Sequence, residues 1–172
     1  MYRILLVDDE PNILSALRRS LASIDVTRLD GEAPKLVAFT SPEAALEHCE
    51  EHEFDLIMTD YRMPTMDGVQ LLTRLMDIQP STPRVIISGY ADRDAIIAAI
   101  NEAQLTRFIQ KPWDDNELRE TVIFILGNAH KKSKAPGFQG SERHLQSLEK
   151  ECPGITEIEK DDGGGIWIGF EE

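Results

Sequence analysis

The chain has 172 residues, 41% of them hydrophobic, and a formal net charge of −13 at pH 7. This length suits one ordinary domain with an appendage, and no stretch approaches the roughly 20 consecutive apolar residues that a membrane span requires. An acidic surface repels phosphate backbones, so direct nucleic-acid binding is not expected.

Short apolar runs alternate with amphipathic segments through the first 128 residues. The apolar runs predict five strands, at residues 3–7, 36–39, 56–59, 85–87 and 106–109. The amphipathic segments predict five helices. Four of them cover residues 11–21, 69–78, 95–100 and 118–126, and the remaining one, second in the chain, starts at Pro42. This alternation is typical of an α/β fold, in which helices cover both faces of a parallel sheet. Ligands of such sheets bind beyond the carboxyl ends of the strands.

Two local signals refine this pattern. Ser41 before Pro42 predicts a helix start, with Ser41 as the N-cap and the proline at the first helical position. The connection at residues 23–35 is long for a link between a helix and a strand, and it contains Asp30-Gly31. We therefore expect a turn-bearing surface insertion there.

The composition changes after residue 128. Residues 129–141 contain three lysines and no acid, which predicts a basic linker, and residues 142–172 form an acidic extension. Within the extension we expect a short helix at 142–151 and a hairpin of two strands. Because such a unit is too small to bury a core alone, it must dock on another surface.

Polar residues follow four of the predicted strands. Asp8 and Asp9 follow the first strand, Asp60 the third, Ser88 the fourth and Lys111 the fifth. Since the strands are parallel, these side chains should converge at one edge. Three crowded carboxylates need a cation, and an oxygen-only set open to water suits Mg²⁺. A carboxylate supported in this way can form an aspartyl-phosphate, with Lys111 supplying positive charge and Ser88 a hydrogen bond.

Four motifs, LLVDDEP, MTDYRMPTMDG, VIISGY and RFIQKPW, occur in this order between residues 3 and 128. Together they resemble the receiver domain of two-component response regulators, as in CheY-like proteins. The resemblance implies a flavodoxin-like, doubly wound sheet of five parallel strands in the order 2-1-3-4-5. It divides the chain into a receiver domain at 1–128, the linker at 129–141 and the helix–hairpin extension at 142–172.

The resemblance also implies a phosphorelay function. A sensor histidine kinase or a phosphotransfer protein would phosphorylate Asp60 in a Mg²⁺-dependent reaction. Asp8, Asp9, Asp60 and the backbone carbonyl of Arg62 would hold the Mg²⁺ ion. Lys111 would contact the phosphoryl group, and its bond to the following proline would be cis.

Ser88 and Phe108 correspond to the hydroxyl and aromatic switch positions of that family. The output would be phosphorylation-dependent binding of an unknown downstream protein, and a homodimer is a further candidate partner. The chain would be a switch and not an enzyme, apart from slow self-dephosphorylation. A short apolar run at the N-terminus and two scattered cysteines, Cys49 and Cys152, favour the cytoplasm over export.

Two enzymatic alternatives remain open. The same acid cluster could serve a metal-dependent phosphoesterase, although no insertion is large enough for the cap domain that such aspartyl-phosphate enzymes use. His48, Glu51 and His52 match the H-x-x-E-H pattern of inverted zinc peptidases. We expect that helix face to lie in solvent, and no distant ligand follows it, which argues against a zinc site.

Overall fold

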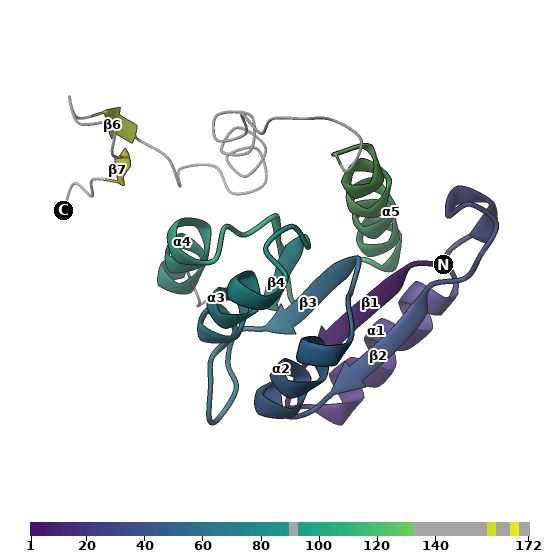
Figure 1. Cartoon of the computed structure of the whole chain (residues 1–172), viewed down its shortest axis with the longest axis horizontal. Helices are drawn as coiled ribbons and strands as arrows, with labels where there is room; N and C mark the ends of the chain where they lie inside the picture. Colours follow the sequence, from purple (N-terminus) through teal and green to yellow (C-terminus); the bar gives the residue numbers. More distant parts are fainter. Residues whose placement is uncertain (90–92, 133–157, 161–165, 169–172) are drawn as a thin grey trace. The chain divides into compact units, whose positions relative to one another are not determined.

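The computed structural model describes residues 1–89 and 93–132, together with two short strands at residues 158–160 and 166–168. Between residues 1 and 132, strands and helices alternate as the sequence predicts (Figure 1). The strands there are β1 (Arg3–Val7), β2 (Lys35–Phe39), β3 (Leu56–Asp60), β4 (Arg84–Ser88) and β5 (Arg107–Gln110). The helices are α1 (Pro11–Ala22), α2 (Pro42–Glu51), α3 (Gly68–Ile78), α4 (Arg93–Glu102) and α5 (Asp115–Lys132), with a short 3₁₀ helix, η1 (Val26–Arg28).

The five strands form one parallel sheet in the order β2-β1-β3-β4-β5, which confirms the predicted doubly wound topology. In the register, Val7 lies beside both Phe39 and Thr59, so β1 and β2 end at the same level and β3 ends one residue further on, at Asp60. The strand order reverses between β1 and β3, which is the point where sheets of this kind bind ligands.

Side chains of the central strands alternate between two cores. Ile4 and Leu6 of β1 pack in one apolar cluster with α1 and α5, whereas Leu5 and Val7 pack in another with α2, α3 and α4. A strand with one face in solvent would alternate apolar and polar residues, but β1 is apolar and buried from Ile4 to Val7 because both faces are covered (Figure 1).

Two helix starts near the carboxyl edge are capped by side chains. The Ser41 hydroxyl accepts a hydrogen bond from the backbone N–H of Ala44, which confirms the predicted N-cap of α2. Asp67 caps α3 reciprocally with Gln70: each side chain accepts a hydrogen bond from the other residue's backbone N–H. These caps satisfy N–H groups that a helix start otherwise leaves unpaired.

The insertion after α1 bears the expected turn, with Asp30 at φ 55° and Gly31 at φ 83°. The prediction that it lies on the surface holds for Val26, which is exposed, but is wrong for two other apolar residues. Ile24 and Leu29 are buried in the cluster beneath α1 and α5. The Arg28 guanidinium also pairs with the Glu120 carboxylate on α5. The insertion is thus anchored to the core, because burying the apolar side chains of Ile24 and Leu29 lowers the free energy of the folded state.

Replacing Leu29 by alanine tests this anchoring. We expect the free energy of unfolding to fall by about 2–5 kcal/mol, because a fully buried leucine would leave a cavity. Val26→Ala in the same insertion is the control, since Val26 is exposed and should change the value little. Denaturant titration followed by circular dichroism measures both variants. Equal, small losses would show that the insertion contributes nothing to the core.

The last helix of the receiver fold runs further than predicted. α5 continues to Lys132, so residues 129–132, which the prediction places at the start of the linker, are helical. Nothing in the sequence from Ala129 to Lys132 breaks a helix. Within the described residues, no helix is long and apolar enough to cross a membrane.

The C-terminal unit is described only in part. β6 (Ile158–Lys160) and β7 (Ile166–Ile168) pair antiparallel, as the hairpin pattern predicts. The helix expected at residues 142–151 lies outside the described residues. The division of the chain into receiver, linker and extension therefore stays a prediction.

Candidate phosphoacceptor site

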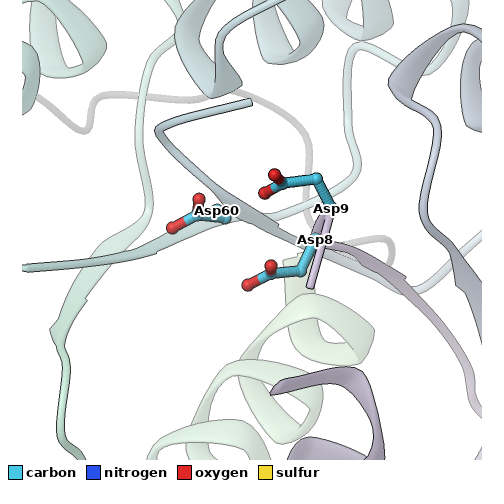
Figure 2. Close-up of side chains that lie close together, drawn as sticks. All are labelled: Asp8, Asp9 and Asp60. Carbon is cyan, nitrogen blue, oxygen red and sulfur yellow. The ribbon is translucent and has the colours of Figure 1, made fainter. Parts of the chain in front are cut away.

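The sheet brings three carboxylates together at its carboxyl edge. Asp8 and Asp9 directly follow β1, and Asp60 is the last residue of β3. Figure 2 shows the three side chains grouped where these strands end, and one oxygen from each lies within 4.8 Å of the others. Asp8 and Asp60 are buried, while Asp9 is partly exposed and keeps the cluster open to solvent.

Lys111 reaches the same cluster from the loop after β5. Its Nζ lies 2.9 Å from Asp8 Oδ2 and 2.9 Å from Asp60 Oδ1, so one ammonium group bridges two buried carboxylates. The bond between Lys111 and Pro112 is cis, in agreement with what the resemblance implies. The predicted meeting of Asp8, Asp9, Asp60 and Lys111 is therefore present in the structure.

Burial and charge act in opposite directions at this cluster. Desolvation raises the pKa of Asp60 above its ordinary value, and the hydrogen bond and charge of Lys111 offset only part of that rise. Desolvation would lower the pKa of Lys111, but its bonds to Asp60 and Asp8 outweigh burial and raise it. Lys111 is thus held in its charged form, whereas ionisation of Asp60 in the folded protein costs free energy.

Replacing Asp60 by asparagine should therefore raise the unfolding temperature in metal-free buffer at neutral pH. Because folding raises the pKa of Asp60, its contribution to stability is present below the ordinary carboxyl pKa and is lost as the pH rises through the raised value. Asparagine keeps the shape without the charge. Thermal unfolding in chelator measures the difference, which should shrink as the pH falls toward the acid range. A lower unfolding temperature for the variant at neutral pH would contradict this account.

Backbone-directed hydrogen bonds orient the two buried carboxyl residues. The N–H of Glu10 donates to Asp8 Oδ1 at 2.9 Å, and the hydroxyl of Thr59 donates to the main-chain carbonyl oxygen of Asp60 at 2.9 Å. The role of Thr59 could not be predicted from the sequence, because a threonine in a strand gives no signal that its hydroxyl turns to the neighbouring carbonyl. These bonds hold the acids in place before any ligand binds.

The residues present fit a Mg²⁺ ion. They supply carboxylate oxygens from three residues at one solvent-accessible edge, and hard divalent cations prefer oxygen ligands and retain waters. Among the described residues, this is the one group of three acids, histidines or cysteines close enough to share an ion. Arg62 follows β3 in the loop to α3, where its carbonyl could complete the set, and its role stays a prediction.

The predicted switch residues lie on the neighbouring strands. Asp60 pairs with Ile87 in the sheet, so the buried Ser88 stands one residue beyond the level of Asp60. Phe108 on β5 pairs with Ile86 on β4, and its partly buried side chain packs against the apolar cluster under α2, α3 and α4. Their positions are compatible with a switch, and their roles stay predictions.

The competing zinc motif has an unsuitable geometry. The imidazole rings of His48 and His52 stack with centroids 4.1 Å apart and planes 5° apart. A metal binds in the plane of an imidazole, and two nearly parallel planes share no such point. His48 is also partly buried against Phe39 and Phe54, so the expectation that this face lies in solvent is wrong. Phe39 and Phe54 both lie against the imidazole ring of His48.

The chain thus folds as a doubly wound parallel α/β domain with an acid cluster and a lysine at the carboxyl edge of its sheet. The family model of the response regulator receiver domain matches residues 4–123. The chain belongs to this family of two-component receiver domains.

Curated relatives agree with this assignment. The hydrogenase transcriptional regulatory protein HoxA of Bradyrhizobium diazoefficiens is 41% identical over 119 residues, which is 69% of this chain and 23% of the relative. HoxA of Cupriavidus necator is 33% identical over 85% of this chain and 27% of the relative. The transcriptional regulatory protein FixJ of Rhizobium meliloti is 33% identical over 70% of this chain and 55% of the relative. The chain therefore spans about a quarter to a half of the length of these relatives.

Solved structures show the same fold. The signal receiver domain of an HD domain-containing protein from Pseudomonas fluorescens matches with a TM-score of 0.66 and 33% identity, covering 76% of this chain and 98% of that one. A CheY-like receiver domain from Methanospirillum hungatei matches with a TM-score of 0.67 and 25% identity, covering 77% and 98%. The receiver fold is thus shared over most of the chain.

Proposed function

We propose that Asp60 accepts a phosphoryl group from a sensor histidine kinase or a phosphotransfer protein in a Mg²⁺-dependent reaction. The observation that carries the proposal is the cluster of Asp8, Asp9 and Asp60, in which Lys111 contacts two of the three carboxylates at 2.9 Å. A purely structural ion pair would need one acid for one base. A surplus of buried acids at a ligand-binding edge is what a cation site requires.

The residues divide the chemistry among them. An oxygen of Asp60 forms the new bond to phosphorus while the bond from phosphorus to the donor's nitrogen breaks, and the leaving imidazole keeps the electron pair. Asp8, Asp9, Asp60 and the Arg62 carbonyl would hold Mg²⁺, which would neutralise charge on the incoming group when bound. Lys111 already stands beside the accepting carboxylate, so its positive charge needs little reorganisation.

The product would act as a signal and not as an intermediate of an enzyme. The aspartyl-phosphate would be lost only by slow self-dephosphorylation, and its output would be altered binding of a downstream protein, with a second copy of the chain as another candidate. The basic linker and acidic extension would serve that output in a cytoplasmic phosphorelay. The relatives named as transcriptional regulators extend beyond the matched region, so their activity is not carried over whole to this chain.

Treatment with a small acyl phosphate and Mg²⁺ tests the proposal. Intact-mass spectrometry should show one added phosphoryl group per chain, and the protein should not turn over a simple phosphate ester such as p-nitrophenyl phosphate. Absence of the adduct at saturating donor would remove the support for the proposal. Steady hydrolysis of the ester would favour the phosphoesterase alternative.

The switch provides a separate prediction. A phosphoryl group adds negative charge and three acceptor oxygens, so Ser88 should move toward it and vacate space beside β4. Phe108 should then turn further inward, and because it has no hydroxyl to hold outside, that form should be partly populated beforehand. Aromatic NMR signals of Phe108, with and without a phosphoryl mimic, report this change. Signals that stay fixed while partner affinity changes would exclude Phe108 from the signal.

A further inference from the structure

Gly68, the first residue of α3, packs against the main chain of Asp60. A Cβ atom added at Gly68 would lie 2.3 Å from the carbonyl oxygen of Asp60 and 3.1 Å from its carbonyl carbon. It would also lie 3.1 Å from the Cα of Tyr61. Non-bonded carbon atoms prefer separations of roughly 3.5–4.0 Å, and these neighbours are backbone atoms that cannot rotate away. No side chain fits here without moving the phosphoacceptor strand or α3.

The requirement at Gly68 is steric and not conformational. Gly68 does not have the left-handed backbone angle found at Gly31, so any residue could adopt its conformation. Glycine is needed for the close approach of two backbones. This distinguishes Gly68 from Gly31, where the turn itself favours glycine.

Contacts before and after Gly68 in the chain hold the start of α3 close to the end of β3. The N–H of Gly68 donates to the Tyr61 carbonyl at 2.9 Å, which closes the loop between β3 and α3. The reciprocal cap of Asp67 and Gln70 fixes the start of α3, and the buried Met63 anchors the loop in the core. The start of α3 is therefore fixed in position and in direct contact with the end of β3.

We infer that Gly68 is a positioning residue for the Asp60 carboxylate and the proposed Mg²⁺ site, an inference that rests on the proposed function. The Asp60 side chain and the carbonyl beside Gly68 share one Cα, so a shift of that carbonyl moves the carboxylate. The site depends on separations of 2.9 Å to Lys111 and at most 4.8 Å to Asp8 and Asp9. Functional groups tolerate displacements of only about 0.5 Å before function is lost.

Gly68→Ala is the direct test, with Mg²⁺ affinity measured by isothermal titration calorimetry. Groups that orient metal ligands typically contribute about 10- to 100-fold in affinity, and we expect a loss in that range. Gly127→Ala on α5 is the matched control, because a Cβ there meets nothing within 4 Å. Its Mg²⁺ affinity should equal that of the unaltered chain.

A second control separates positioning from loss of stability. Gln79→Ala removes buried hydrogen bonds to Phe54, Cys49 and His52 at the opposite end of the sheet, so it should destabilise the fold without moving Asp60. We expect Gln79→Ala to bind Mg²⁺ normally below its unfolding temperature. Equal loss of affinity in both variants, or normal affinity in folded Gly68→Ala, would overturn the inference.

Thr59→Val covers the case in which Gly68→Ala does not fold. It keeps the side-chain shape and removes the hydroxyl bond to the same Asp60 carbonyl, so we expect a smaller but measurable loss of Mg²⁺ affinity. Unchanged affinity in Thr59→Val would then overturn the inference. If the unaltered chain binds no Mg²⁺, the proposed function fails instead, and the two failures are distinguishable.

Discussion

Asp60→Asn is expected to reduce phosphoryl incorporation from a small acyl phosphate to background. The amide keeps the shape of the side chain but lacks the carboxylate oxygen that would attack phosphorus. Asp8 is a poor substitute, because both of its carboxylate oxygens are engaged, Oδ1 by the N–H of Glu10 and Oδ2 by Lys111. Intact-mass spectrometry at equal donor concentration and time measures the loss.

Asp77→Asn is the matched control for this experiment. Asp77 is exposed on α3, so the substitution makes the same chemical change and the same change in net charge away from the site. This variant should be labelled as the unaltered chain is. Comparable labelling of Asp60→Asn would mean that another residue accepts the phosphoryl group.

Removal of divalent metal should reduce phosphoryl labelling about as strongly as Asp60→Asn does. Three carboxylates with one bridging lysine leave excess negative charge, which repels a phosphoryl donor unless a cation offsets it. Excess chelator should therefore stop labelling, and added Mg²⁺ should restore it. Asp9→Asn should weaken Mg²⁺ binding, and more Mg²⁺ should then be needed for half-maximal labelling.

Glu10→Gln controls for the loss of charge in Asp9→Asn. The Glu10 side chain is exposed and lies outside the group of three acids, although it is the next residue in the chain. Labelling of the Glu10→Gln variant should depend on Mg²⁺ concentration in the same way as labelling of the unaltered chain. Labelling at full rate in excess chelator would show that the acid cluster acts without a metal.

Much of the site could be predicted from the sequence because parallel strands end together. Each apolar run stops at a polar residue, so Asp8, Asp60 and Lys111 could be placed at one edge without coordinates. The strand order required the resemblance, since apolar runs do not say which strands are neighbours. Once the order is known, the meeting of Asp8 and Asp60 follows from the adjacency of β1 and β3.

The remaining features depend on contacts between segments distant in sequence. The burial of Leu29 depends on the space beneath α1 and α5, which the polar turn residues around it conceal. The partly buried position of His48, which stacks on His52, depends on Phe39 from β2 and on Phe54 from the connection between α2 and β3. A local pattern gives the type of an element, but it does not show which neighbours surround a side chain.

The close approach at Gly68 was missed for a related reason. A glycine at a helix start commonly indicates flexibility or a turn, whereas here it indicates the distance between two backbones. The spacing from Asp60 to Gly68 is visible in the sequence, but the contact becomes apparent only when the loop between them is closed. The same loop carries Arg62, so its closure also determines where that carbonyl lies.

The most direct measurement is to locate the phosphoryl group on the chain. The protein labelled in the presence of Mg²⁺ would be treated with borohydride, which reduces an acyl phosphate to an alcohol, then digested and sequenced by mass spectrometry. We expect the reduced residue to be at position 60, and we expect no reduced residue when labelling is carried out without Mg²⁺. A phosphoryl group found instead on Ser88 or a histidine, or reduction at Asp8 or Asp9, would contradict it.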